Sequence, residues 1–232
     1  MTKQVFFSSI LMLTILNIKA QQKFEIGIEG GVSQYFYSIV ETQNNLKNTP
    51  NISGFGGVNF RLNSNKKFFG EVGFILTEYT EGIKLRQELG YITSNHDGVL
   101  IIPFRFGRPF LIAKCLSFVP SVGMALAIKT SSQDGSSSSY RESVGNTSLM
   151  YDYTFRRNGK DLFFLMNGNA MFEWEFKNKM KVLAGVNYYQ GFTKVSVADI
   201  SYKINNEPMQ AGLLIGKGTF IGYSIGLKYS IK

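Results

Sequence analysis

Apolar residues alternate with polar or small residues along eight segments of this chain, and this repeat constrains the fold more than any other feature. In the clearest segment, Ile221, Tyr223 and Ile225 alternate with Gly222 and Ser224. A period of two residues is typical of β-strands that have one apolar and one polar face. We therefore predict strands in the segments 23–29, 52–62, 68–77, 100–106, 115–129, 162–176, 181–193 and 221–232.

The connections between these strands alternate in length. Short polar links at 63–66, 107–109 and 177–179 join the second strand to the third, the fourth to the fifth and the sixth to the seventh. The remaining connections are long and contain the segments 34–51, 79–97, 130–160 and 195–217. Outer-membrane barrels have short periplasmic turns and long extracellular loops. Because backbone polar groups must all be paired in lipid, we predict an all-β fold, an eight-stranded antiparallel up-and-down transmembrane β-barrel.

The N-terminal residues have the organisation of a secretory signal peptide. Lys3 precedes the uncharged segment 5–18, and Ala20 is a small residue at the expected cleavage point. This segment is too short to cross a bilayer as a helix. We predict a cleaved signal peptide at 1–20, followed by one barrel domain at 21–232 located in the cell outer membrane.

Aromatic residues recur near the short turns, on the apolar faces of the predicted strands. Such residues form girdles at the membrane interfaces of β-barrels. The predicted girdle contains Phe60, Phe68, Phe106, Phe172, Trp174, Phe176 and Tyr229. Alternation alone does not decide which face points inward, so a soluble secreted lipocalin-like carrier with an apolar interior is an alternative. The signal peptide, the girdle and the unequal loop lengths favour the membrane barrel.

The charges of the polar faces gather toward the short-turn ends of the strands. The predicted lumen charge cluster contains Lys23, Glu25, Arg61, Glu71, Arg105, Glu173, Glu175, Lys181 and Lys228. Side chains can fill an eight-stranded barrel, and unpaired charges inside it would be destabilising. We therefore predict a salt-bridged, filled lumen. A polar conduit is the alternative, although the narrow interior argues against a porin.

Three segments resemble a known family. The sequences QQKFEIGIEGG, IIPFRFG and GYSIGLKYSIK are similar to those of Bacteroidetes outer-membrane β-barrel proteins of the PorT-like group, and more distantly to OmpX- and OmpA-like eight-stranded barrels. The resemblance covers residues 21–232. It implies an outer-membrane barrel and would permit a place in a secretion or gliding assembly.

His96 is the one histidine of the chain and lies beside Asp97 in the predicted loop 79–97. Some eight-stranded outer-membrane barrels are lipid A acyl-modifying enzymes that use a histidine near the outer rim. The His-x-Ser spacing of the deacylase type is absent, because Asp97 and Gly98 follow His96. We predict that the protein is not an enzyme and keep lipid A modification as the alternative.

The expected partners follow from the predicted location. Basic residues occupy the short turns, where cations can interact with anionic headgroups, so we expect outer-membrane lipids as partners and no nucleic acid. With one Cys and one His, the chain offers no His/Cys zinc site, and we expect no metal and no cofactor. We predict a monomer with a structural role, or one that binds a protein or glycan through the extracellular loops 34–51, 79–97, 130–160 and 195–217.

Overall fold

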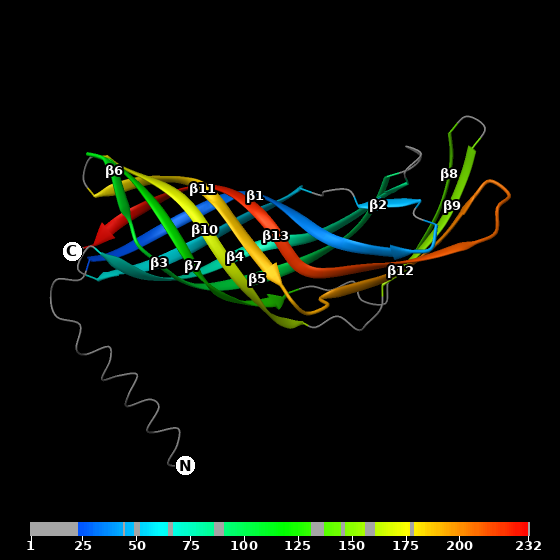
Figure 1. Cartoon of the computed structure of the whole chain (residues 1–232), viewed down its shortest axis with the longest axis horizontal. Helices are drawn as coiled ribbons and strands as arrows, with labels where there is room; N and C mark the ends of the chain where they lie inside the picture. Colours follow the sequence, from blue (N-terminus) through cyan, green and yellow to red (C-terminus); the bar gives the residue numbers. More distant parts are fainter. Residues whose placement is uncertain are drawn as a thin grey trace, which may run out of the picture.

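The computed structural model describes residues 23–43, 45–48, 52–64, 67–85, 91–130, 137–144, 147–155, 161–176 and 179–231, and thirteen β-strands lie in these ranges (Figure 1). The strands are β1 (Lys23–Glu41), β2 (Leu46–Asn48), β3 (Ile52–Ser64), β4 (Phe68–Leu85), β5 (Tyr91–Gly107), β6 (Phe110–Ala113), β7 (Leu116–Lys129), β8 (Ser137–Val144), β9 (Thr147–Phe155), β10 (Leu162–Phe176), β11 (Met180–Gly191), β12 (Ser196–Ile204) and β13 (Gln210–Ile231). No helix within these ranges is long and apolar enough to cross a membrane. The predicted signal peptide at 1–20 lies outside the described residues.

Eight of the strands form a closed antiparallel barrel. Their order is β1-β3-β4-β5-β7-β10-β11-β13, and β13 pairs back onto β1. The register of this closing pair runs from Phe24 opposite Ile231 to Glu41 opposite Gly212. The prediction of an eight-stranded antiparallel barrel is therefore confirmed, and each predicted segment overlaps one of these strands.

The wall of the barrel carries large apolar side chains on its outer face, and polar side chains line much of its inner face. Ile28, Phe104 and Ile225 are 57%, 56% and 64% exposed, whereas Asn59 and Asn187 are buried in the interior. A soluble lipocalin-like carrier would instead have a polar outer face. The hypothesis of a soluble carrier is therefore wrong for this chain.

The long connections contain more strand than we predicted. Within 34–51, β1 continues to Glu41 and β2 follows, and within 79–97, β4 and β5 leave only 86–90 between them. Within 130–160 lie β8 and β9, and 195–217 holds β12 and the start of β13. The alternation is weak in these segments because the inward positions are apolar as well, as at Tyr35, Tyr37 and Tyr79, which are buried. His96 consequently lies in β5, opposite Thr80 of β4, rather than in a loop.

The sheet of the wall continues beyond the closed barrel at the end opposite the short turns. There β12 pairs with β13, β9 pairs with β12, and β8 pairs with β9. In Figure 1 this extension projects away from the end where β1 begins and β13 ends. The fold therefore combines a closed barrel with an open sheet that ends at β8.

Candidate functional site in the barrel interior

Three cations surround the Glu71 carboxylate in the half of the barrel nearer the short turns. Arg61 Nε donates to Glu71 Oε2 at 2.9 Å, and Lys228 Nζ donates to the same oxygen at 3.0 Å. Arg105 Nη1 donates to Glu71 Oε1 at 3.0 Å. Since all four side chains are buried, this carboxylate links β3, β4, β5 and β13 across the interior.

Glu173 and Glu25 extend the same network to β10, β11 and β1. Glu173 accepts hydrogen bonds from Arg61, and from Lys181 and Lys228 at 3.4 Å each. Lys181 Nζ donates to Glu25 Oε1 at 2.7 Å, and Arg61 Nη1 lies 3.7 Å from Glu25 Oε2. Each of these two glutamates therefore pairs with more than one cation.

The interior charge cluster of the structure is balanced. Glu29 joins it, because its Oε1 lies 3.6 Å from Arg105 Nη1. The members are Glu25, Glu29, Arg61, Glu71, Arg105, Glu173, Lys181 and Lys228, four acids and four bases. A buried charge needs a partner to offset its lost hydration, and here each of the eight charges has one.

The structure places seven of the nine residues of the predicted lumen charge cluster together and separates two. Lys23 and Glu175 are exposed at the rim, where they line the mouth of a cavity of about 440 Å³ that Glu25, Glu173 and Lys181 of the cluster line as well. Lys23 and Glu175 lie too near the barrel end to be enclosed, so their predicted place in the lumen is corrected. The predicted cluster left out Glu29. This residue follows Glu25 by four positions in β1, so the alternation places both on the inward face.

A second buried ion pair lies farther from the short turns. Lys129 Nζ is 3.3 Å from Asp97 Oδ2, and both side chains are 1% exposed. Asp97 is opposite Tyr79 in the sheet, and Lys129 is opposite Val99. Sequence reasoning missed this pair because it assigned Asp97 to a loop, whereas β5 directs this residue inward.

Apolar side chains fill the half of the interior that lies away from the short turns. Tyr189 stacks on Phe220 with ring centroids 4.4 Å apart, and Tyr35 contacts both Phe220 and Tyr79 at 4.9 and 4.7 Å. This apolar cluster contains Tyr35, Tyr37, Leu46, Ile75, Tyr79, Val99, Ile101, Ala125, Ala127, Phe163, Leu165, Tyr189, Val195, Ala198, Ile200, Tyr202, Ile204, Leu214 and Phe220. Because β12 and β2 contribute to it, it extends beyond the barrel proper.

Glu41 connects the strands at this far end. Its carboxylate accepts hydrogen bonds from the backbone N–H of Leu46 and, at 2.8 Å, from the hydroxyl of Tyr202. Burial, together with the Glu41 carboxylate, raises the pKa of Tyr202 to about 12. The end of β1 is thereby tied to both β2 and β12.

The predicted girdle residues lie on the outer surface near the short turns. Phe68, Phe106, Phe172, Trp174, Phe176 and Tyr229 are 42–58% exposed, and Phe60 is half-buried. Phe68 stacks on Phe106 at 5.6 Å, and Phe24 stacks on Phe60 at 6.2 Å. The part of the chain that the structure describes contains no group of three or more His, Cys, Asp or Glu side chains able to hold a metal ion.

The chain is similar in fold to solved outer-membrane barrels. Its structure aligns with that of OprG from Pseudomonas aeruginosa with a TM-score of 0.52 and 12% identity, over 89% of this chain and 95% of OprG. Neisserial surface protein A aligns with a TM-score of 0.50 and 8% identity, over 90% of this chain and 97% of that protein. No protein-family model matches the sequence, and no curated protein does either. At these identities the likeness concerns the fold alone.

The fold and the apolar exterior together identify an integral outer-membrane protein. The outer surface of the wall is a band of large apolar side chains, and the backbone groups of the wall are paired around a closed barrel. Both properties are required of a β-structure that spans lipid. In such barrels the short turns face the periplasm, so the open sheet that ends at β8 lies on the extracellular side.

Proposed function

We propose that the protein is a non-conducting outer-membrane barrel that binds a protein partner at the extracellular edge of β8. The observation that carries this proposal is the sheet that leaves the barrel and ends at an open edge. Within the described ranges, β8 pairs with β9 alone. An edge strand can accept an extended segment of another protein through main-chain hydrogen bonds.

The composition of β8 leaves this edge accessible. Ser137, Ser139, Arg141 and Ser143 are exposed, and the segment 137–144 contains no proline and no lysine, which commonly protect such edges. Its serines are small, so a partner strand could approach the backbone closely. The pairing would use main-chain groups for affinity and neighbouring side chains for selectivity.

The filled interior supports a role other than transport. The interior charge cluster occupies the periplasmic half, and the apolar cluster occupies the extracellular half. Eight strands enclose little more space than side chains need. A role at the surface therefore agrees better with this interior than the conduit does.

The family, the oligomeric state and the absence of catalysis are parts of the same proposal. Membership of the PorT-like group would agree with a protein partner, because the family resemblance permits a place in a secretion or gliding assembly. We expect a monomer, since the closed wall offers no edge to a second copy and the open edge of β8 is assigned to a partner protein. We also expect no catalysis, so His96→Ala should leave the mass spectrum of the host lipid A unchanged, and a lost acyl modification would contradict this expectation.

The experiment that tests the proposal selects extended peptides on the purified protein from a displayed heptapeptide library. Selected peptides should protect the β8 amides from hydrogen exchange, and Ser139→Pro should abolish their binding without changing the heat-modifiable migration of the barrel. Peptides that bind Ser139→Pro as well as the unmodified protein would refute edge pairing. Stable, large unitary currents in a planar bilayer would separately refute the non-conducting barrel.

A further inference from the structure

An apolar groove of about 680 Å³ runs along the outer surface of the barrel near the periplasmic end. It lies over β1, β3, β4, β5 and β7. Its lining residues include Phe60, Leu62, Phe104, Phe106 and Met124. The groove therefore faces lipid, at the level of the aromatic girdle.

The groove exists because Gly70 carries no side chain. Gly70 is opposite Leu62 on one side and Phe106 on the other, so its position belongs to the outward row of β4. A Cβ atom at Gly70 would have no heavy atom within 4 Å. Packing of the barrel therefore does not require glycine here, and a larger residue would fill the groove without disturbing the wall.

A cation, Arg108, lies beyond the periplasmic side of this groove and is connected to it through two stacked rings. Phe106 lines the groove and stacks on Phe68, and the guanidinium carbon of Arg108 lies 5.8 Å from the centroid of the Phe68 ring. The same carbon lies 5.3 Å from the centroid of the Phe110 ring, and Arg108 is exposed. The two rings hold the guanidinium beside the apolar surface, in the way that cation–π contacts orient arginine.

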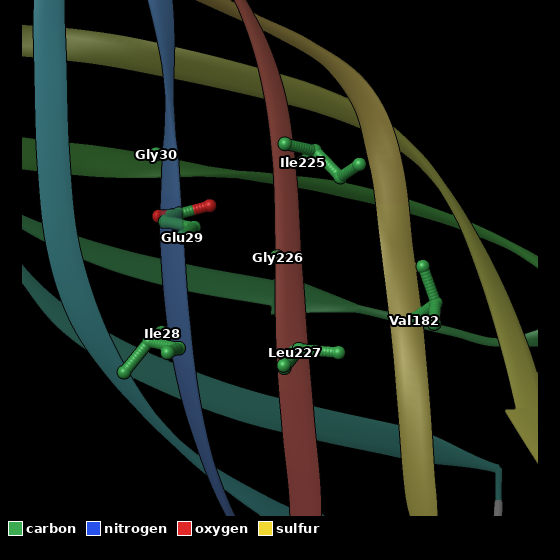
Figure 2. A pocket seen from close by; sticks show the side chains of 7 residues that line it. All are labelled: Ile28, Glu29, Gly30, Val182, Ile225, Gly226 and Leu227. Atoms are coloured by element: carbon green, nitrogen blue, oxygen red, sulfur yellow. The ribbon is translucent and has the colours of Figure 1, made fainter.

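A second outer groove lacks this combination. It has a volume of about 380 Å³ and is lined by Gly30 and Ile28 on β1, Val182 on β11 and Ile225 on β13, among others (Figure 2). No aromatic residue and no cation lines it. Its aromatic lining, and the arginine held beside that lining by Phe68, thus distinguish the Gly70 groove from the groove at Gly30.

We propose that the Gly70 groove holds one acyl chain of a phospholipid from the periplasmic leaflet while Arg108 binds its phosphate. The occupant follows from charge and polarity, since a long apolar groove beside a cation complements a chain attached to an anionic headgroup. The site prefers an anionic phospholipid, because Lys67 is also exposed in the adjoining turn.

The test is native mass spectrometry of the full barrel, released from detergent after incubation with phosphatidylglycerol or phosphatidylethanolamine. Gly70→Leu should remove the retained phospholipid, whereas Gly168→Leu should retain it. Gly168 is a matched control because it is also outward-facing with no heavy atom within 4 Å of an added Cβ. Heat-modifiable migration on a gel reports that each variant is folded.

The headgroup contact is tested with charge variants. Arg108→Gln should weaken retention of phosphatidylglycerol about fivefold, the effect of one cation near anionic lipid. Lys179→Gln, in the turn between β10 and β11, should leave retention unchanged. Unchanged retention in Gly70→Leu would overturn the groove assignment, and unchanged retention in Arg108→Gln would overturn the phosphate contact. Equal losses in Gly70→Leu and Gly168→Leu would show annular lipid only and would also overturn the proposal.

Discussion

The two halves of the barrel interior are filled in different ways, although one closed wall encloses both. In the periplasmic half, four glutamates pair with two arginines and two lysines. In the extracellular half, aromatic and aliphatic side chains pack together. Ion pairs depend on particular partners, whereas apolar packing depends on filled volume. Truncations in the two halves should therefore have different consequences.

A hydrogen bond joins the two clusters. Arg105 Nη2 donates to the hydroxyl of Tyr189 at 2.7 Å, and the Tyr189 ring stacks on Phe220. Arg105 belongs to the interior charge cluster, and Tyr189 belongs to the apolar cluster. Since the clusters share this contact, we expect the interior to unfold as one unit.

The largest effect is expected from removing one carboxylate of the charged half. Glu173→Gln leaves Arg61, Lys181 and Lys228 without one of their acids, and breaking a buried pair in this way costs about 3–5 kcal/mol. The free energy of unfolding in detergent, measured by urea titration, should fall by this amount.

The matched control for this variant lies two residues away on the same strand. Glu175 is exposed at the rim, so Glu175→Gln should change the free energy of unfolding by less than about 1 kcal/mol. Equal effects of Glu173→Gln and Glu175→Gln would show that the charged half does not depend on its particular partners.

A smaller effect is expected from truncation in the apolar half. Leu165 is 1% exposed inside the barrel, whereas the next residue, Met166, is 54% exposed on the outer face. Leu165→Ala should lower the free energy of unfolding by about 2–4 kcal/mol, because it leaves a cavity that neighbours cannot fill. Met166→Ala should cost less, since lipid or detergent replaces the lost contacts. A larger loss for Met166→Ala would reverse the assignment of the two faces.

The different filling of the two halves also explains which strands could be predicted from the sequence. In the charged half, ionic residues of the inward row such as Glu25, Arg61 and Glu173 alternate with apolar residues of the outward row, and this contrast was sufficient to place strands and faces, although Phe69, Val119, Met171 and Leu183 are also buried there. In the apolar half both rows contain large apolar residues, as at Tyr35 and Phe36. Alternation then loses its contrast, which is why segments that are strands were predicted as loops.

The pairing of individual charges could not be predicted from the sequence. Which carboxylate meets Arg105 depends on strand order and on the stagger of strands around the barrel, and the alternation within one strand contains neither. For the same reason Asp97 and Lys129 were not paired in advance. Lys23 and Glu175 lie at the ends of their strands. They occupy the alternate positions whose side chains point inward, but they lie beyond the enclosed part of the interior.

The smallest effect should come from Tyr202, a polar exception in the apolar half. Its hydroxyl donates to Glu41 at 2.8 Å, and the side chain is 1% exposed. Tyr202→Phe removes this hydrogen bond and should lower the free energy of unfolding by about 1 kcal/mol at pH 8. Urea titration of both proteins in the same detergent measures this difference.

The pH dependence of that difference identifies its origin. The pKa of Tyr202 rises from 10.0 to about 12 in the folded protein, so folding favours the neutral phenol. Its contribution to stability is complete below pH 10 and is lost as pH rises from 10 toward 12, because the unfolded phenol ionises first. The stability difference between the unmodified protein and Tyr202→Phe should therefore shrink over this range. Tyr223→Phe, on the exposed outer face, is the control, and an unchanging Tyr202 difference up to pH 12 would exclude the buried phenol as its source.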